Sequence, residues 1–411
     1  MAENTPAIAP RRPRTARELG IMRGFPPPPE KRPTLENWDL APFNRWSFQN
    51  IRSLFPTTNV ARGTGAAQPF DADRQDLGGL TFAAVDGSRK TILDWLDESY
   101  TDGFLVCHRG RVVTELYFND MTPQTPHLSQ SVAKSVVGAL AGVLNGEGVL
   151  PLDVPLAELV PELARCGYAH ATLAQVLDMQ SGVRFVEDYG VPHSDMTRID
   201  IASGWRPPRP GEPVPTIRDV ILTLPQERPH GHSFAYRSIE TDVLAWVIER
   251  VADQPLAALL ADRIWSRIGA ENDAFFTVDA AGTALADGGF NATLRDYARF
   301  GQMMLDGGRA GGRQVVPASW VAACRDGEAH KFGSPYTNVA PNGAYSRQWW
   351  VHDVERGNFM ARGVFGQLIH LDPASEIVVV KLSTWPDYLI ESFTLDTLAG
   401  VTAIREALST D

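Results

Sequence analysis

The chain has 411 residues and a formal net charge of −11, because 49 acidic residues outnumber 38 Lys and Arg. That charge argues against a nucleic-acid partner, since binding phosphates needs a basic field. No stretch approaches the roughly 18 consecutive apolar residues of a membrane span. A hydrophobic share of 44% with 21% charged residues is typical of a globular chain, and the length predicts two or three domains.

The first residues and the cysteines indicate a compartment. Cys107, Cys166 and Cys324 are odd in number and scattered, which excludes a disulfide framework and favours a reducing interior. Residues 1–34 are rich in Pro and Arg and lack the apolar run of a signal peptide. We therefore expect a cytoplasmic protein whose residues 1–34 form a Pro-rich arm over the surface.

The patterns along the chain predict strands at both ends and helices between them. Residues 104–108 and 111–118 flank an Arg-Gly turn and predict a hairpin. The β-branched run 376–383 predicts a late strand. Apolar residues recur at helical spacing in four segments, 131–148, 171–182, 240–265 and 292–308.

This order predicts an α/β (α+β) fold in which both chain ends build one sheet. The expected sheet domain comprises residues 35–130 and 325–411, and a mainly helical domain, residues 131–324, is inserted between them.

The sharpest chemical signal is the pair Ser131 and Lys134. Lys134 is the only charged residue between Ser131 and Leu144, and the i, i+3 spacing places both side chains on one helix face. Burial favours the neutral amine, as a base for a serine nucleophile requires. The alternative is that Ser131 is a helix cap and Lys134 reaches solvent.

Tyr236 stands before a predicted helix and could relay a proton, although such tyrosines are more often packing residues. Other chemistries have less support. The nine histidines include no HExxH and no carboxylate at ligand spacing, so no metal is expected. No G-x-S-x-G and no complete dinucleotide fingerprint occurs.

The Ser-x-x-Lys helix and the tyrosine about a hundred residues later resemble the serine β-lactamase-related family, and more specifically its nylon-oligomer hydrolases. The resemblance runs from about residue 33 to near the C-terminus. It is carried by LDMQ (177–180), EDY (187–189), SGWR (203–206), TDVLAWVIERV (241–251), MMLDGG (303–308), RQWW (347–350), ERGN (355–358) and KLSTWPD (381–387).

The resemblance implies an antiparallel sheet domain beside an all-helical domain, as in serine β-lactamases and DD-peptidases, with the active site between them. Ser131 would be the nucleophile, Lys134 its base and Tyr236 the proton relay. The backbone N–H groups of Ser131 and Val364 would hold the oxyanion. No metal or organic cofactor is implied.

The resemblance also implies a substrate, a linear amide such as the dimer of 6-aminohexanoate. Tyr189 would contact the scissile amide, Asp200 would bind the free ammonium, and Trp350 would line the pocket. A short-chain carboxylesterase and a catalytically silent binding protein on the same scaffold are the alternatives. A homodimer is also implied.

Three residues depart from the pattern of the wider family. Phe365 stands where a histidine is expected, Asp287 stands where an asparagine or histidine is expected, and Arg237 follows the tyrosine. We expect Asp287 to contribute to substrate binding, where an extra carboxylate could favour a cation. These departures bear on the substrate and leave the serine, lysine and tyrosine in place.

Overall fold

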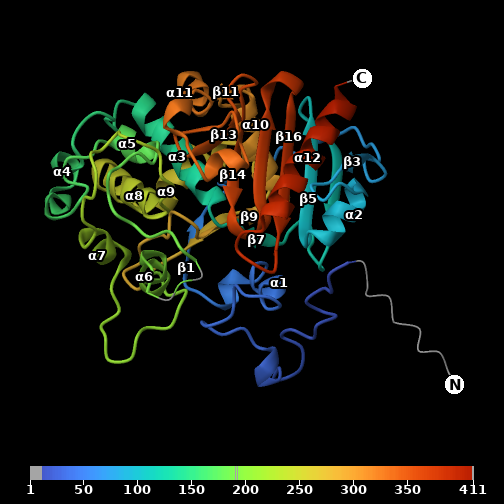
Figure 1. The fold of residues 1–411 in the computed structure, drawn as a ribbon, viewed down its shortest axis with the longest axis horizontal. Helices are drawn as coiled ribbons and strands as arrows, with labels where there is room; N and C mark the ends of the chain where they lie inside the picture. Colours follow the sequence, from blue (N-terminus) through green and yellow to red (C-terminus); the bar gives the residue numbers. More distant parts are fainter. Residues whose placement is uncertain (1–11, 190, 192, 410–411) are drawn as a thin grey trace.

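The centre of the fold is an eight-stranded sheet that both ends of the chain build (Figure 1). A computed structural model describes residues 12–189, 191 and 193–409. The strand order is β12 (Ala344–Ser346), β13 (Trp349–Asp353), β14 (Asn358–Gly363), β15 (Gln367–Asp372), β16 (Ile377–Ser383), β5 (Thr101–His108), β6 (Arg111–Tyr117) and β2 (Asp71–Ala72). The late strand β16 pairs antiparallel with β5 of the predicted hairpin, so the α/β prediction is confirmed.

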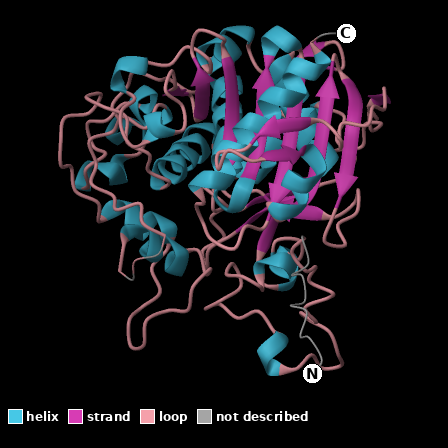
Figure 2. Cartoon of the chain, turned by 45° about the vertical axis from the view of Figure 1, so that its right-hand side comes forward, coloured by secondary structure: helices cyan, strands magenta, loops and turns pink. Residues whose placement is uncertain are grey.

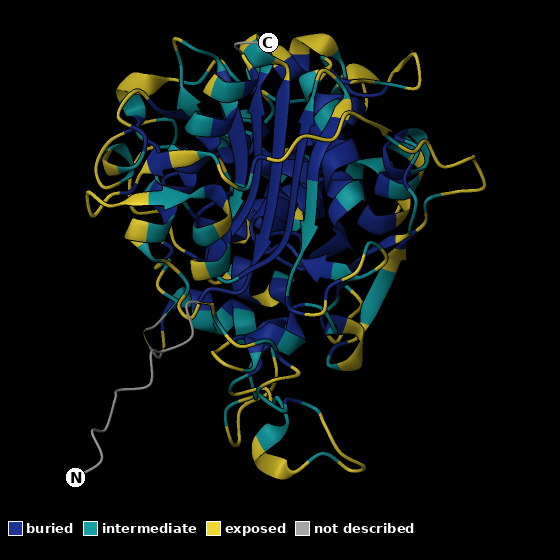
Figure 3. Ribbon diagram, turned by 90° about the vertical axis from the view of Figure 1, so that its right-hand side faces the viewer, coloured by how far each residue is buried: buried dark blue, intermediate teal, exposed yellow. Residues whose placement is uncertain are grey.

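Alternate residues of the central strands face two helical layers (Figure 2). Ile377 and Val379 pack with α2 (Ile92–Glu98) and α12 (Glu391–Leu408). Val378 and Val380 face the other side, where α10 (Leu294–Leu305) and α3 (Val132–Gly146) pack. Because helices cover both faces, the strands read as continuous apolar runs, and Figure 3 shows them buried.

The remaining helices of the central segment lie to one side of the sheet, at the left of Figure 1. They are α4 (Leu156–Leu159), α5 (Leu173–Leu177), α6 (Asp195–Ala202), α7 (Ile217–Leu222), α8 (Ile239–Ala252) and α9 (Leu256–Arg263). The helical pattern over 240–265 forms two main helices. Asp253, with φ of 51°, is left-handed and ends α8. Pro255 is the residue before α9, and a proline there prevents α8 from continuing into α9.

The last strand of a second, four-stranded sheet precedes the turn of residues 129–131, which ends at Ser131 and is called the Ser131 turn below. The order of this sheet is β1 (Thr57–Val60), β8 (Ala274–Thr277), β9 (Phe290–Thr293) and β7 (Pro126–Leu128), and β7 ends three residues before Ser131. Short elements complete the fold: α1 (Asn44–Ser47), α11 (Ala318–Ala323), and the two-stranded pairs β3 (Thr81–Ala83) with β4 (Arg89–Thr91) and β10 (Arg309–Ala310) with β11 (Arg313–Gln314).

The N-terminal segment lies against the core over its later part. Trp38 is buried and its indole N–H donates to the carbonyl of Trp205 at 2.8 Å. Phe25, by contrast, is fully exposed. The division of the chain at 34, 130 and 324 stays a prediction, and α10, which it assigned to the helical part, packs on the large sheet. Within the described residues, no helix has both the length and the apolar character that crossing a bilayer requires.

Helix α3 depends on glycines to pack closely under the sheet. A Cβ on Gly142 would lie 2.4 Å from the Trp320 ring, and one on Gly138 would lie 2.6 Å from the carbonyl oxygen of Arg347. Neither neighbour has room to move, because Trp320 is buried and the other contact is backbone.

We therefore expect Gly142→Val to lower the free energy of unfolding by about 1–3 kcal/mol, the usual cost of overpacking. The measurement is a urea unfolding curve. Gly79→Ala is the matched control, because a Cβ there meets nothing within 4 Å. Equal stability of Gly142→Val and the parent protein would show that α3 does not pack this tightly.

Candidate active site

Ser131 and Lys134 meet at the start of α3. Ser131 is the residue before the first helical turn, and Gln130 ahead of it is left-handed, with φ of 49°. The Lys134 ammonium donates to Ser131 Oγ at 2.9 Å and to the carbonyl oxygen of Asp287 at 2.7 Å. Lys134 is 2% exposed, so it does not reach solvent. The helix-cap alternative also lacks support, because the Ser131 side chain makes no capping hydrogen bond.

Tyr236 lies over the same amine. The Lys134 Nζ atom is 5.4 Å from the centre of the Tyr236 ring, which stacks on Trp350 with centroids 5.2 Å apart. The backbone N–H of Tyr236 donates to the Tyr336 hydroxyl at 3.0 Å. Burial raises the pKa of the Tyr236 phenol, and the nearby Lys134 only partly offsets this. The phenol is therefore neutral near pH 7.

A cavity of about 520 Å³ opens beside these three side chains. It is bounded by both parts of the fold, with aromatic residues predominating near Tyr236. Its lining residues are Ser131, Glu187, Tyr189, Tyr236, Pro335, Tyr336, Asn338, Val339, Trp350, Arg362, Gly363, Val364, Leu389, Glu391 and Thr394. The sequence placed Tyr189, Trp350 and Val364 at such a site, and all three lie in its wall.

Gly363 lets strand β14 approach the Ser131 turn. A Cβ at this position would lie 2.5 Å from the carbonyl oxygen of Ser129 and 3.0 Å from the backbone nitrogen of Ser131. Only glycine allows so close a backbone contact without displacement. The contact brings Val364, the next residue, into the same wall as Ser131.

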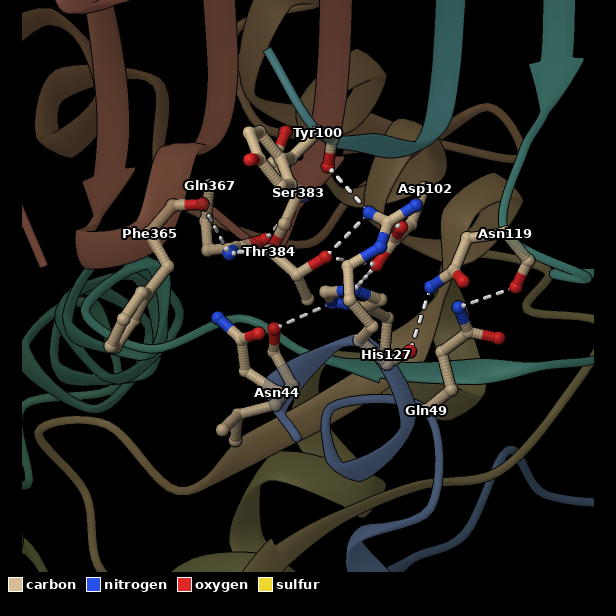
Figure 4. A network of polar contacts seen from close by, with 12 residues as sticks. Asn44, Gln49, Tyr100, Asp102, Asn119, His127, Phe365, Gln367, Ser383 and Thr384 are labelled. Carbon is tan, nitrogen blue, oxygen red and sulfur yellow. Dashed lines mark hydrogen bonds and ion pairs between the residues drawn. The ribbon is translucent and has the colours of Figure 1, made fainter. Parts of the chain in front are cut away.

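A buried polar network lies behind the Ser131 turn (Figure 4). Asp102 is its centre: it accepts from Arg45 at 2.7 Å, from Thr384 at 3.1 Å, and lies 3.1 Å from His127 Nε2. These contacts join the N-terminal segment, β5, β7 and the end of β16. Since His127 belongs to β7, the network fixes the strand that delivers Ser131.

Glu187 is an acidic residue in the cavity wall that sequence reasoning did not select. Its carboxylate accepts from the Tyr189 hydroxyl at 2.6 Å and from the backbone N–H of Ser238 at 2.8 Å. The Tyr189 ring also stacks on Tyr388, with centroids 5.4 Å apart. The signal was present in the segment EDY, whose first letter is Glu187, but only its last residue, Tyr189, was selected.

Asp200 is not among the residues that line this cavity. It is partly buried at the end of α6, where its backbone carbonyl accepts from the N–H groups of Trp205 and Arg206. Burial raises the pKa of its carboxyl group to about 7, and the charge of Arg206 offsets only part of the rise. Its predicted contact with substrate therefore stays a prediction.

Asp287 lies beneath Lys134 rather than in the cavity wall. It is 2% exposed and close to the carboxyl group of Asp242, which accepts from the N–H of Ala286 at 2.9 Å. Burial raises the pKa of Asp287 to about 6, although Lys134 opposes the rise. Asp287 contacts Lys134 through its backbone carbonyl oxygen. The predicted role of its side chain in substrate binding stays untested.

The other two departures from the family pattern have structural explanations. Phe365 is left-handed, with φ of 61°, and its buried ring packs on Phe48 and Tyr388. Arg237 does not line the cavity, and its guanidinium pairs with the buried Glu240. Neither residue lines the cavity, and no group of three potential metal ligands occurs among the described residues.

Comparison with known proteins identifies the family. The family model described as Beta-lactamase matches residues 98–399, and the chain belongs to that family.

Two relatives narrow the comparison. The 6-aminohexanoate-dimer hydrolase of Paenarthrobacter ureafaciens is 40% identical over 357 residues, which cover 86% of this chain and 89% of that protein. A Bacillus anthracis protein, to which the same activity is provisionally ascribed, superposes with a TM-score of 0.85 at 29% identity, over 92% of this chain and 97% of that one.

A family VIII carboxylesterase shares the fold at 16% identity. Its TM-score is 0.57, over 74% of this chain and 93% of that one. At this distance the comparison bears on the fold alone.

The protonation of Lys134 differs from the sequence-based expectation. Burial alone would lower its pKa, but the carboxyl groups around it, Asp287 first among them, hold the pKa above the ordinary value. The resting amine is therefore an ammonium ion, and it can accept a proton only after losing one.

We expect the rate at which a fluorophosphonate labels Ser131 to rise with pH as Lys134 loses its proton. Asp287→Asn removes a negative neighbour, which lowers the pKa of Lys134 and moves the rise to lower pH. Mass spectrometry of the labelled peptide measures the rate. Asp306→Asn, at the end of α10, is the control. An unchanged or upward-shifted profile in Asp287→Asn would contradict this electrostatic coupling.

Proposed function

We propose that this chain is a serine hydrolase that cleaves linear amides of ω-amino acids, typified by the 6-aminohexanoate dimer, through an acyl-enzyme. The observation that carries the proposal is the 2.9 Å contact between Lys134 Nζ and Ser131 Oγ at the wall of a substrate-sized cavity. A hydroxyl within hydrogen-bond reach of an amine is the arrangement that serine activation requires.

In the first step, Ser131 Oγ attacks the amide carbonyl carbon and its proton passes to the neutral form of Lys134. The carbonyl oxygen becomes an oxyanion, which the backbone N–H groups of Ser131 and Val364 stabilise. The close approach at Gly363 supports this pairing of donors. Each such donor is typically worth about 10²–10³ in rate.

In the second step, the C–N bond breaks and Tyr236 delivers a proton to the departing amine. Lys134 then returns its proton to Tyr236, a transfer that their proximity supports. Water attacks the acyl-enzyme by the reverse route, which releases the acid and restores the Ser131 hydroxyl. These residues alone supply the nucleophile, the base and the acid.

The substrate assignment rests on the relative at 40% identity and on Tyr189 and Trp350, which line the cavity. Asp200 would attract the substrate ammonium, although it does not line the cavity. Glu187 is a second acid near that end, although donors from Tyr189 and Ser238 already engage it. The cytoplasmic location and the homodimer stay predictions.

The direct test is release of free 6-aminohexanoate from its dimer, followed by chromatography with mass detection. The parent protein should release it, and Ser131→Ala should reduce the rate by several orders of magnitude. Short-chain esters serve as the second substrate. Cleavage of esters without any release from the dimer would favour a carboxylesterase, and no labelling of Ser131 would favour a silent binding protein.

The raised pKa of Asp200, about 7, predicts how substrate binding varies with pH. Below that pH the carboxyl group is protonated and cannot pair with an ammonium, so KM for the dimer should fall as pH rises through 7. Asp200→Asn should raise KM and remove this pH dependence. Asp97→Asn, on α2, is the control. The same pH dependence in Asp200→Asn would place the ammonium elsewhere, and Glu187→Gln would then be the next variant.

A further inference from the structure

Arg362 is a cation in the cavity wall that has no anionic partner. It lies near the end of β14, and its side chain borders the same cavity as Ser131 and Tyr236. Its guanidinium carbon is 5.3 Å from the centre of the Trp350 ring. Within the described part of the chain, no carboxylate lies within ion-pair distance of Arg362 and no hydrogen bond involves its side chain.

Arg362 is half-buried, and the three fully buried arginines among the described residues are all paired with acids. Arg45 contacts Asp102 at 2.7 Å, and Arg237 and Arg299 each pair with an acid three residues away in the sequence. An unpaired charge that has lost much of its hydration is costly unless something compensates it. Burial lowers the pKa of Arg362 to about 10, so the group remains a cation at neutral pH.

Neither acidic residue in the wall of the same cavity pairs with this charge. Glu187 is engaged by Tyr189 and Ser238, and Glu391, at the start of α12, makes no ion pair with Arg362. The cavity wall thus contains the carboxylate of Glu187 beside Tyr189, and the unpaired guanidinium of Arg362 on β14. A guanidinium in this setting is suited to a planar carboxylate, which can accept two parallel hydrogen bonds.

We propose that Arg362 binds the carboxylate at the leaving-group end of the substrate. The inference rests on the proposed function: if Asp200 attracts the ammonium at the acyl end, the free carboxylate of a linear ω-amino acid dimer lies beyond the scissile amide. The contact with the Trp350 ring holds the guanidinium at the cavity wall, and its charge favours a carboxylate over a neutral end. The site therefore selects zwitterionic linear amides over their neutral-ended analogues.

The first measurement does not depend on amide cleavage. It is protection of Ser131 from fluorophosphonate labelling by 6-aminohexanoate and by 6-aminohexanamide, which differs only in its neutral end. We expect the acid to protect at a concentration at least about tenfold lower than the amide, and Arg362→Gln to abolish that difference. Arg362→Lys, which keeps the charge without the planar pair of donors, should retain part of it.

The second measurement compares kcat/KM for the dimer and for the dimer whose carboxyl end is amidated. The parent should prefer the free acid through KM, and Arg362→Gln should cleave both alike. Arg52→Gln is the matched control, since Arg52 also lies over an aromatic ring, Phe275, at another site. Equal protection by acid and amide in the parent, or an unchanged preference in Arg362→Gln, would overturn the role of Arg362.

The two proposals fail in distinguishable ways. If the parent cleaves neither dimer but the acid still protects Ser131 through Arg362, the anion site stands and the amidase assignment falls. If the parent cleaves both dimers equally well, the amidase assignment stands and the anion site falls. An arginine that only braced Trp350 would change both substrates alike when replaced.

Discussion

The buried ammonium of Lys134 is the constraint on which the rest of the site depends. A charge that is 2% exposed must be compensated, and here Ser131 Oγ and the carbonyl of Asp287 accept its hydrogen bonds while nearby acids offset its charge. The same contacts that make the charge tolerable orient the nucleophile. A separate polar network around Asp102 holds the strand that leads to Ser131 (Figure 4).

Local patterns were sufficient to predict much of the fold. The hairpin β5–β6, the strand β16 and the helix α3 each follow from periodicity and turn residues, and the pairing of β16 with β5 agrees with a sheet built from both ends. Pro255 marks the break between α8 and α9 in the sequence. Apolar residues at helical spacing on both sides of it nevertheless suggested one continuous helical segment. The i, i+3 spacing of Ser131 and Lys134 likewise predicted that both side chains share one helix face, and their contact confirms it.

The partners of each site residue could not be predicted, because they come from distant segments. Asp287 reaches Lys134 through its backbone carbonyl, while its carboxyl group faces Asp242, and no sequence pattern distinguishes these two surfaces. The sequence shows Arg362 beside Gly363, but only the fold shows that none of the described carboxylates pairs with it. The protonation of Lys134 also depends on acids that folding assembles, which is why burial alone predicted the opposite direction.

The most direct test of the proposed chemistry is to trap the acyl-enzyme. The parent protein is mixed with the 6-aminohexanoate dimer, quenched in acid at short times and digested, and the peptide that carries Ser131 is examined by mass spectrometry. The proposed mechanism predicts a transient adduct of one 6-aminohexanoyl group on Ser131, formed together with the release of one equivalent of free 6-aminohexanoate. Turnover of the dimer with no such adduct at any time, and with Ser131→Ala still active, would contradict it.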